Sequence, residues 1–336
     1  MTTNGDAVKV VPVRHYGRWA AAGFALLIVA MLIHTLLSKL PTGQFACQVV
    51  NGVRKCHPDL TWRFSWTIVG QYFTTSEILH GLVTTLELTV LAMVVGIVLG
   101  MTLAIMRLSP NRVLSTAAWT YTWFFRGTPV LVQLLVWYNI AILYPVLSIG
   151  IPFTPSSWAL VHITTRTLFS AFAAAVIAFG LNEAAYMSEI ARAGLIAVDE
   201  GQVEAAISLG MMRRQSLRYV VLPQAMRVIV PPTGNEVISM LKTTSLAGFV
   251  GVVELLGAAS NIYGGNYEIM PLLIVASLWY LIVTTILSIG QFYLERHFAK
   301  GALRSPPPTP VQRIRDDVRG ILRKFRTQRG PLEAVR

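Results

Sequence analysis

The chain has 336 residues, of which 54% are hydrophobic and only 13% are charged. Soluble domains carry roughly 25% charged residues, so this composition argues against a soluble enzyme. The mean hydropathy is +0.57, and several apolar runs exceed the roughly 18 residues that a helix needs to cross a bilayer. The composition therefore predicts an all-α integral membrane protein.

The formal net charge is +12, a value that would also suit a nucleic-acid-binding protein. However, 11 of the 28 Lys and Arg residues lie at or after Arg296, and five more lie between Arg192 and Arg227. Basic residues that cluster between and after apolar spans follow the positive-inside rule. Aromatic and basic side chains also do not interleave as they do in single-strand-binding surfaces. We therefore expect no nucleic-acid partner, and we place both termini in the cytoplasm.

Six apolar segments are predicted to span the membrane. The length of the first favours an anchored helix over a cleaved signal peptide, whose apolar core is shorter. In the second, Gly96 and Gly100 have the small-xxx-small spacing that lets two helices approach closely. Arg126–Pro129 predicts a break near the cytoplasmic surface, and Pro231–Pro232 predicts a kink. The six spans are Trp19–Leu37, Ile78–Met106, Pro129–Leu147, Thr167–Ile190, Pro223–Val250 and Ile269–Tyr293.

The segments between and around the spans complete the predicted organisation. External segments are expected at Ile151–Pro155 and Ala258–Glu268. After the Pro-rich Ser305–Pro310, apolar residues recur at helical spacing among many Arg residues, which predicts an amphipathic helix for an anionic lipid surface. A disordered basic tail is the alternative. The predicted regions are a cytoplasmic N-terminus (1–18), an extra transmembrane helix (19–40), an external loop (41–76), the main transmembrane domain (77–296) and a basic cytoplasmic tail (297–336).

The two cysteines of the chain, Cys47 and Cys56, both lie in the first external loop. An oxidising compartment favours their pairing, and a bridge that closes a loop of about ten residues contributes roughly 2–3 kcal/mol. His57 is adjacent, but two Cys and one His lack the fourth ligand of a structural zinc site. We predict a structural disulfide, with a redox switch as the alternative, and no metal site.

Sequence motifs for chemistry are missing. The chain contains no nucleotide-binding loop, no zinc-protease motif and no nucleophile elbow, and its six His residues are scattered. We therefore expect the chain not to be an enzyme and to hold no cofactor of its own.

The segment between the fourth and fifth spans carries the most informative pattern. Asp199 can cap a short helix, with Gln202 as its reciprocal partner, and Gly210 can end that helix in the left-handed conformation. A second helix is expected from Met211 to Tyr219. On this pattern alone, the segment is either an ordinary interfacial loop or a small unit that inserts into a groove of a partner.

Glu204-Ala205-Ala206, followed by Gly210 and then Leu222-Pro223, resembles the EAA motif of permease subunits of ATP-binding-cassette importers. Val220 stands where that family usually has Ile. The flanking segments are similar to polar amino-acid permeases of the histidine/glutamine type, and the resemblance covers about residues 79–296. These segments are Arg126–Pro129, Leu131–Gln133, Ala185–Ile190, Gly201–Gln202, Pro223–Ala225 and Leu241–Leu246.

This resemblance implies a type I importer permease with a core of five transmembrane helices, to which the first span adds a sixth. It implies that Glu204, Ala205, Ala206 and Gly210 belong to a coupling helix that docks on an ATPase. It also implies the partners: a second permease subunit, identical or related, two ATPase subunits that hold ATP and Mg²⁺, and an extracytoplasmic binding protein that delivers a polar amino acid. The implied location is the inner membrane of a bacterial cell.

Four charged residues are predicted within or near the spans: Glu87, Glu183, Glu236 and Arg126. Charged groups are expensive in a bilayer and need partners. We hypothesise that Glu87 and Glu183 line the substrate pathway and bind an ammonium or a cationic side chain, with structural pairing as the alternative. Glu236 could instead pair with Lys242. Arg126 could meet a substrate carboxylate or anchor its helix at the interface.

Two other classes of function compete with the importer. A proton-coupled carrier would use Glu87 and Glu183 as a proton relay, but such a carrier has no reason to hold an ATPase-docking segment. A membrane-embedded enzyme would need a catalytic constellation that the sequence lacks. We therefore predict the permease subunit of an ATP-driven amino-acid importer.

Overall fold

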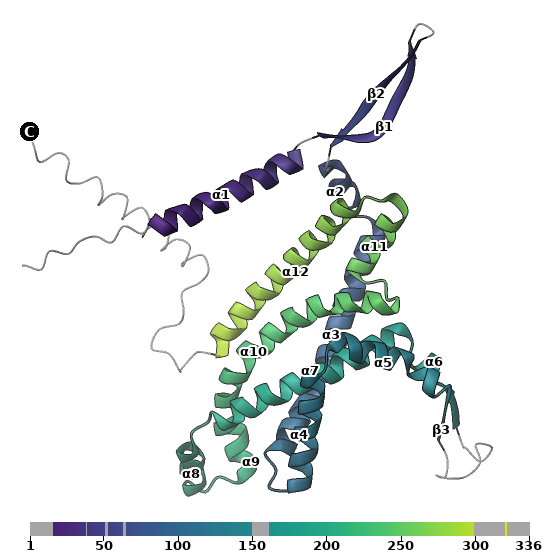
Figure 1. The fold of residues 1–336 in the computed structure, drawn as a ribbon. Helices are drawn as coiled ribbons and strands as arrows, with labels where there is room; N and C mark the ends of the chain where they lie inside the picture. The colour runs from purple at the N-terminus through teal and green to yellow at the C-terminus, as the bar shows by residue number, and fades with distance from the viewer. Residues whose placement is uncertain are drawn as a thin grey trace, which may run out of the picture.

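The computed structural model describes residues 16–37, 39–50, 53–62, 65–149, 161–298 and 320. The predicted tail helix and the predicted turn at 151–155 lie outside these residues. Figure 1 shows an elongated, mainly helical molecule, with α8 at one end and α2 and α11 toward the other. Its helices are α1 (Tyr16–Leu37), α2 (Trp66–Tyr72), α3 (Ser76–Arg107), α4 (Arg112–Gly127), α5 (Val130–Leu143), α6 (Thr165–Leu168), α7 (Ala171–Ile196), α8 (Glu200–Ser208), α9 (Arg213–Ser216), the π-helical η2 (Leu217–Val221), α10 (Leu222–Thr243), the 3-10 helix η3 (Thr244–Val250), α11 (Leu255–Asn266) and α12 (Ile269–Phe298).

Up to five membrane spans are present in the described part of the chain. Helices α3, α7 and α12 are each long and apolar enough to cross a membrane. Two bent units also qualify: α4 with α5, and the stretch 213–250 with α11. The bend between α4 and α5 is 103°, and it lies at the predicted break, where α4 ends at Gly127 and Pro129 precedes α5. Helix α1 has 22 residues and a length of about 33 Å; it coincides with the predicted first span, so a sixth span remains a prediction.

The tightest packing in the fold joins α3 to α7. A Cβ atom added at Gly96 would lie 2.5 Å from Cγ of Glu183, and one added at Gly100 would lie 2.5 Å from Cβ of Met187. From the other side, Gly180 of α7 lies against Val95. Only glycine allows the two backbones to approach this closely. The close helix contact predicted from Gly96 and Gly100 is confirmed.

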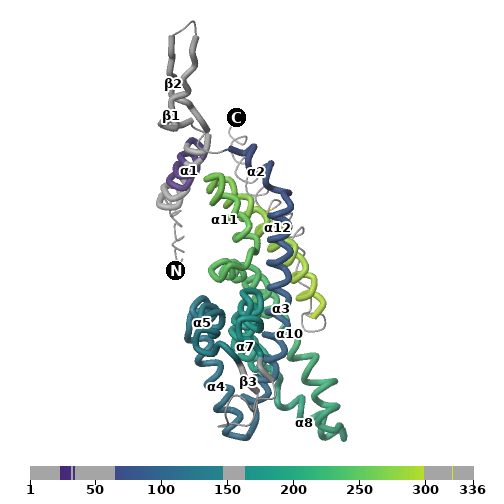
Figure 2. Tube along the Cα trace, turned by 90° about the vertical axis from the view of Figure 1, so that its right-hand side faces the viewer, coloured from purple at the N-terminus to yellow at the C-terminus, as the bar shows by residue number. Residues whose placement is uncertain are grey.

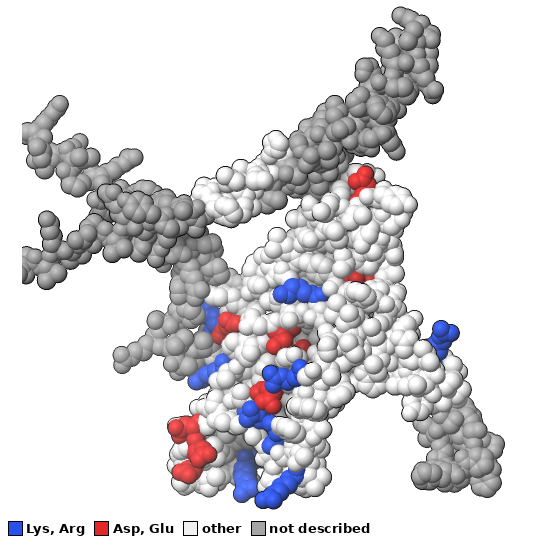
Figure 3. All heavy atoms as spheres, viewed as in Figure 1, with Lys and Arg blue, Asp and Glu red and all other residues white. Residues whose placement is uncertain are grey.

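The outer surface of the helices is apolar, as expected for a protein surrounded by lipid. Val90, Ile142 and Leu281 expose more than half of their surfaces, while the core side chains Leu88 and Phe179 are fully buried between α3 and α7. In Figure 2, α7 lies between α5 and α3. In Figure 3, charged side chains gather around α8, α10 and α4 in the lower half of the view, whereas the upper half is mostly uncharged.

Two antiparallel β-hairpins correct the all-α prediction. Strand β1 (Lys39–Val50) pairs with β2 (Val53–Trp62), and β3 (Val146–Ile149) pairs with β4 (Val161–Thr164). The first hairpin occupies the segment predicted as an external loop, and Cys47 lies directly opposite Cys56 in its register. The side chains of this hairpin are outside the described part, so the disulfide remains a prediction that the register favours.

Candidate functional site

A cluster of charged side chains lies where α4 breaks into α5, against α7 and α10. Arg126, at the end of α4, places its guanidinium carbon 5.2 Å from the ring centroid of Tyr186 on α7, a cation–π contact. The charge of Arg126 also acts on the carboxylate of Glu236 on α10, which in turn acts on Glu183 of α7. Three of the four charged residues predicted for the substrate pathway are thus brought together by the fold.

Glu183 is the most deeply buried member of this cluster. Its side chain is 4% exposed, and it packs on the bare backbone of Gly96. Its Oε1 atom has no hydrogen-bond partner among the described residues. A buried carboxylate oxygen without a partner is energetically unfavourable. The cluster of two carboxylates and one guanidinium therefore contains an unused acceptor, the Oε1 atom of Glu183.

An amide network that the sequence analysis missed fastens α7 to the α4–α5 break. Asn182 Nδ2 donates to the Phe125 carbonyl oxygen at 2.9 Å and to Gln133 Oε1 at 3.2 Å. Gln133 Nε2 donates to the same Phe125 oxygen at 2.9 Å and to the Thr128 hydroxyl oxygen at 2.7 Å. The available signal was an amide residue inside each of two apolar runs. These bonds satisfy backbone groups that the break leaves without helical partners.

Glu87 does not join the cluster. It lies nine residues before Gly96 on α3, and nine residues rotate a helix by about 180° from one side chain to the other. Because Gly96 faces Glu183, Glu87 points to the opposite side of α3, where it is exposed between Val83 and Val90. Sequence position could not show this, because the face of α3 that packs on α7 depends on tertiary contacts.

Glu236 and Lys242 do not form the hypothesised pair. Within the described part of the chain, ion pairs join only Arg107, Glu189 and Arg192. Lys242 is exposed on α10. The cation that acts electrostatically on Glu236 is instead Arg126, at the end of α4.

The segment between α7 and α10 has the predicted cap and the predicted left-handed glycine. The Asp199 carboxylate accepts a hydrogen bond from the Gly201 N–H at 2.7 Å at the start of α8. Gly210 has φ +82°. The Gly210 N–H donates to the Ile207 oxygen and the Met211 N–H to the Ala206 oxygen, which is the Schellman arrangement. The reciprocal bond expected from the Gln202 side chain is not among the described hydrogen bonds.

The second helix of this segment differs from its prediction. Helix α9 begins at Arg213, and it continues through the π-helical η2 directly into α10 without a stop at Pro223. The π-helical turn η2 lies directly before Pro223, and the Leu222 N–H donates to the Leu217 oxygen there. The helix therefore passes through the proline, which has no N–H to donate, at a locally widened turn.

The two alanines of α8 point in different directions. Ala206 is 4% exposed and is buried within this chain, while Glu204 and Ala205 are exposed. Leu209 and Met212 are the most exposed large apolar residues of the segment, at 84% and 74%, and Ile207 of α8 is also exposed. A contact made by α8 with another protein would therefore involve Ala205 and Leu209, whereas Ala206 holds α8 to its own chain.

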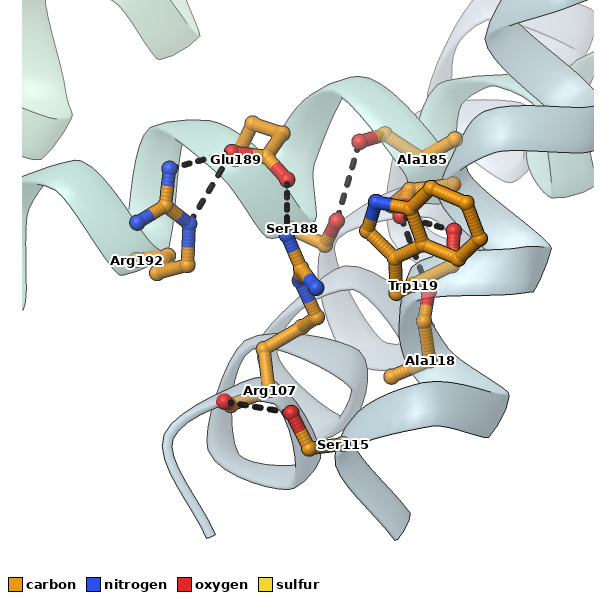
Figure 4. A network of polar contacts seen from close by, with 9 residues as sticks. Arg107, Ser115, Ala118, Trp119, Ala185, Ser188, Glu189 and Arg192 are labelled. Carbon is orange, nitrogen blue, oxygen red and sulfur yellow. Dashed lines mark hydrogen bonds and ion pairs between the residues drawn. The ribbon is translucent and has the colours of Figure 1, made fainter. Parts of the chain in front are cut away.

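A second ionic cluster lies between the charged site and α8 along α7. Glu189 accepts two hydrogen bonds from Arg192, at 2.7 and 3.0 Å, and its other oxygen lies 3.7 Å from Nη2 of Arg107 at the end of α3. Figure 4 shows Arg107 between this carboxylate and α4, where the Ser115 hydroxyl donates to the Arg107 carbonyl oxygen. One carboxylate thus holds the ends of α3 and α7 together just before the chain enters α8.

Replacement of Glu189 with Gln is expected to lower the stability of the protein by about 1–2 kcal/mol, because two partly buried arginines lose the one anionic partner that they have within the described residues. The thermal unfolding midpoint of the detergent-solubilised protein measures the effect. Glu268→Gln is the matched control, because Glu268 is partly buried but forms no ion pair within the described residues. Equal midpoints for the two variants would show that Glu189 does not stabilise the contact between the ends of α3 and α7.

The described residues contain no group of three or more His, Cys, Asp or Glu side chains that could hold a metal ion.

The comparisons with known proteins agree with this architecture. The family described as binding-protein-dependent transport system inner membrane component matches residues 96–300. An arginine transport system permease of Corynebacterium glutamicum is 42% identical over 306 residues, which are 90% of this chain and 87% of that protein. An L-cystine transport system permease of Bacillus subtilis is 37% identical over 232 residues, covering 69% of this chain and 90% of the relative.

A solved structure gives the same result for the fold. A crystal structure described as an amino acid ABC transporter with histidines matches with a TM-score of 0.58 and 34% identity, over 70% of this chain and 100% of that one. The chain therefore belongs to the binding-protein-dependent transport system inner membrane component family and is a permease subunit of an amino-acid ABC importer.

Proposed function

We propose that this permease carries a basic amino acid and that Glu183 binds its cationic group. The observation that carries the proposal is the buried Glu183 oxygen without a hydrogen-bond partner, beside a second carboxylate. A cationic group placed there would gain a charge-assisted hydrogen bond and would relieve the repulsion between Glu183 and Glu236. The name of the Corynebacterium glutamicum relative, an arginine permease, supports a basic substrate.

Arg126 completes the proposed site. An amino acid carries a carboxylate as well as an ammonium group, and a guanidinium binds a carboxylate through two parallel hydrogen bonds. Arg126 is exposed and is held over the Tyr186 ring, so its charge is available to a ligand. Glu183 and Glu236 at one end and Arg126 at the other then give the site the polarity of a zwitterion.

Glu87 enters the proposal through a second permease subunit. A carboxylate on the exposed, valine-rich face of a membrane helix is unfavourable if it faces lipid. A second copy or a related permease that covers this face, or a water-filled pathway between the two subunits, would remove that penalty. We therefore keep Glu87 in the substrate pathway of the assembled pair rather than in the cluster of a single chain.

The family supports proposals for the coupling helix and the partner subunits, and the sequence supports those for the first span and the tail. We propose that α8 is the coupling helix, with Glu204, Ala205, Ala206 and Gly210 forming the unit that meets a separate ATPase subunit, which holds ATP and Mg²⁺. A binding protein delivers the substrate at the opposite end. In this arrangement α1 is a sixth span, both termini are cytoplasmic in a bacterial inner membrane, and the basic tail contacts anionic lipid.

Reconstitution tests the proposed substrate class. The permease and its ATPase subunits are placed in proteoliposomes with the cognate binding protein, and ATP-dependent uptake of labelled arginine, glutamine and glutamate is measured. We expect arginine uptake with a kcat/KM at least about tenfold above that for glutamate, because one unfavourable charge contact changes binding by about 1.4 kcal/mol or more. Arginine binding to the permease–ATPase complex without the binding protein is the control for selectivity in this chain. Equal uptake of glutamate would contradict the proposal.

A further inference from the structure

Glu254 is a buried acidic residue that the proposed transport site does not use. It lies at the start of α11, toward the end of the molecule opposite α8 (Figure 1). Its side chain is fully buried. A buried carboxylate is tolerated only where hydrogen bonds replace its lost hydration, so the partners of Glu254 indicate what it holds.

The bonds around Glu254 join three helices. Its carboxylate accepts hydrogen bonds from the Leu256 and Gly257 N–H groups at 2.9 and 2.7 Å, which caps α11. The Tyr280 hydroxyl on α12 donates to the same carboxylate at 3.0 Å. The next residue, Leu255, donates its N–H to the Thr85 hydroxyl on α3 at 3.1 Å. Glu254 therefore caps α11 and fixes it to α12, while its neighbour fixes it to α3.

The backbone adopts the left-handed conformation on both sides of α11. Gly251, three residues before Glu254, has φ +87°, and Tyr267, which ends α11, has φ +62°. The axis of α11 departs by 46° from that of the preceding helical stretch. Left-handed residues interrupt a helix on both sides, so α11 is a short separate rod rather than a continuation of its neighbours.

The other side of α11 borders free space. A pocket of about 390 Å³ lies between η3 and α11, and its lining includes Gly248, Gly251, Gly257 and Ser260. On the side toward α3, by contrast, Gly81 packs so closely that an added Cβ would lie 2.8 Å from the Ala258 Cβ. Helix α11 is thus hydrogen-bonded and tightly packed on one side, with room for movement on the other.

We infer that Glu254 is a positioning residue of the outer gate: its bonds to Tyr280 and the adjoining Thr85 bond hold α11 closed against α12 and α3. The gate opens when α11 turns about Gly251 into the neighbouring pocket. This inference rests on the proposed orientation of the importer, in which the α11 end receives the substrate.

Cysteine accessibility tests the gate in the full permease–ATPase complex in proteoliposomes. A single cysteine at Ala259, a fully buried residue of α11, is introduced with Cys47→Ser and Cys56→Ser. The rate at which this cysteine reacts with a membrane-impermeant maleimide is measured in three complexes: one without a further substitution, one with Tyr280→Phe and one with Thr85→Val. Tyr293→Phe is the matched control on α12, because the ring of Tyr293 is exposed and its hydroxyl has no described hydrogen bond. A cysteine at Ala178, buried in α7, reports general unfolding.

We expect Tyr280→Phe and Thr85→Val to raise the labelling rate at Ala259→Cys by about tenfold, because each removes one bond that keeps the gate shut. Tyr293→Phe and the cysteine at Ala178 should show no change. In the complex without Tyr280→Phe or Thr85→Val, ATP and vanadate should also raise the labelling rate, because the gate opens during the transport cycle. If the bonds around Glu254 only stabilised the fold, nucleotide would not change the labelling rate.

Two results would overturn the inference. In the first, neither Tyr280→Phe nor Thr85→Val changes the labelling rate. In the second, the rate rises in these variants but does not respond to nucleotide. Arginine uptake is recorded in the same vesicles. A complex whose labelling responds to nucleotide but that transports no basic amino acid would contradict the proposed substrate and leave the gate standing.

Discussion

Glu183→Gln is expected to lower kcat/KM for the uptake of a basic amino acid by about 10- to 100-fold, the loss that follows when a hydrogen bond to a charged group becomes neutral. Gln fills nearly the same volume beside Gly96, so the packing of α3 on α7 is preserved. The change removes the negative charge and leaves an amide whose N–H groups repel a cationic ligand. The effect is therefore expected in substrate binding and transport rather than in assembly with the ATPase.

Uptake in proteoliposomes measures this effect, and co-purification of the ATPase subunits checks assembly. Glu77→Gln is the matched control, because Glu77 is an exposed residue in the first turn of α3. Glu236→Gln should cause a smaller loss, since removing Glu236 also removes its repulsion of Glu183. Wild-type uptake by the Glu183→Gln complex would show that the buried carboxylate does not bind the substrate.

Gly210→Val is expected to uncouple ATP hydrolysis from transport. Gly210 has φ +82°, a conformation that costs most L-residues roughly 1–2 kcal/mol and a β-branched residue more. Valine would pull the chain out of the left-handed region and break the two hydrogen bonds that end α8. The exposed side chains of Leu209 and Met212 on either side would then be reoriented. We expect uptake to fall by at least about tenfold, as the loss of more than 1.4 kcal/mol predicts.

Gly210→Asn is the control at the same position, because Asn adopts the left-handed conformation far more readily than valine. It should retain most of the uptake and the ATP hydrolysed per amino acid imported. The measurement is uptake and ATPase activity in the same vesicles, with the amount of bound ATPase subunit determined by co-purification. If valine and asparagine behave alike, the left-handed turn is not needed for coupling.

A bulky substitution at Ala206 has a different meaning from one at Ala205. The sequence predicted that both small residues allow a partner to approach. The structure buries Ala206 within this chain, so enlarging it disturbs the seat of α8, whereas enlarging the exposed Ala205 acts on the surface that a partner would meet. The spacing of the motif identified the helix, but only its packing distinguishes its two faces.

Much of the fold could be predicted because the sequence of a membrane-spanning helix is recognisable within a single segment. A run of apolar residues long enough to cross a bilayer fixes a span, and Gly96 with Gly100 marks a helix contact within a single segment. The hairpin at β1 and β2 was missed although Asn51-Gly52, between Val50 and Val53, is a common hairpin signal. The segment is polar in part and lies outside the apolar spans, and these features alone favour a loop.

The site was predicted in composition but not in arrangement. Glu183 and Glu236 were singled out because each is an acid in an apolar setting. The proximity of Glu183 and Glu236 depends on the packing of α7 against α10. The role of Arg126 as the cation that acts on Glu236 depends on how the chain bends by 103° between α4 and α5, and no local pattern states where such a bend points. The orientation of Glu87 and the hydrogen bonds around Glu254 likewise depend on contacts between residues far apart in the sequence.

The glycine contact between α3 and α7 has a mechanical consequence. Two helices whose backbones touch cannot slide or rotate past each other without a clash, so α3 and α7 move as one stiff beam. Helix α7 has 26 residues and a length of about 39 Å. A tilt of about 10° applied at the α8 end of such a beam displaces its far end by about 7 Å, since displacement grows with length along a rigid rod. A distance of that size is comparable with the width of an amino acid. A small rotation of the helix pair at the α8 end could therefore open or close a passage for the substrate at the other end.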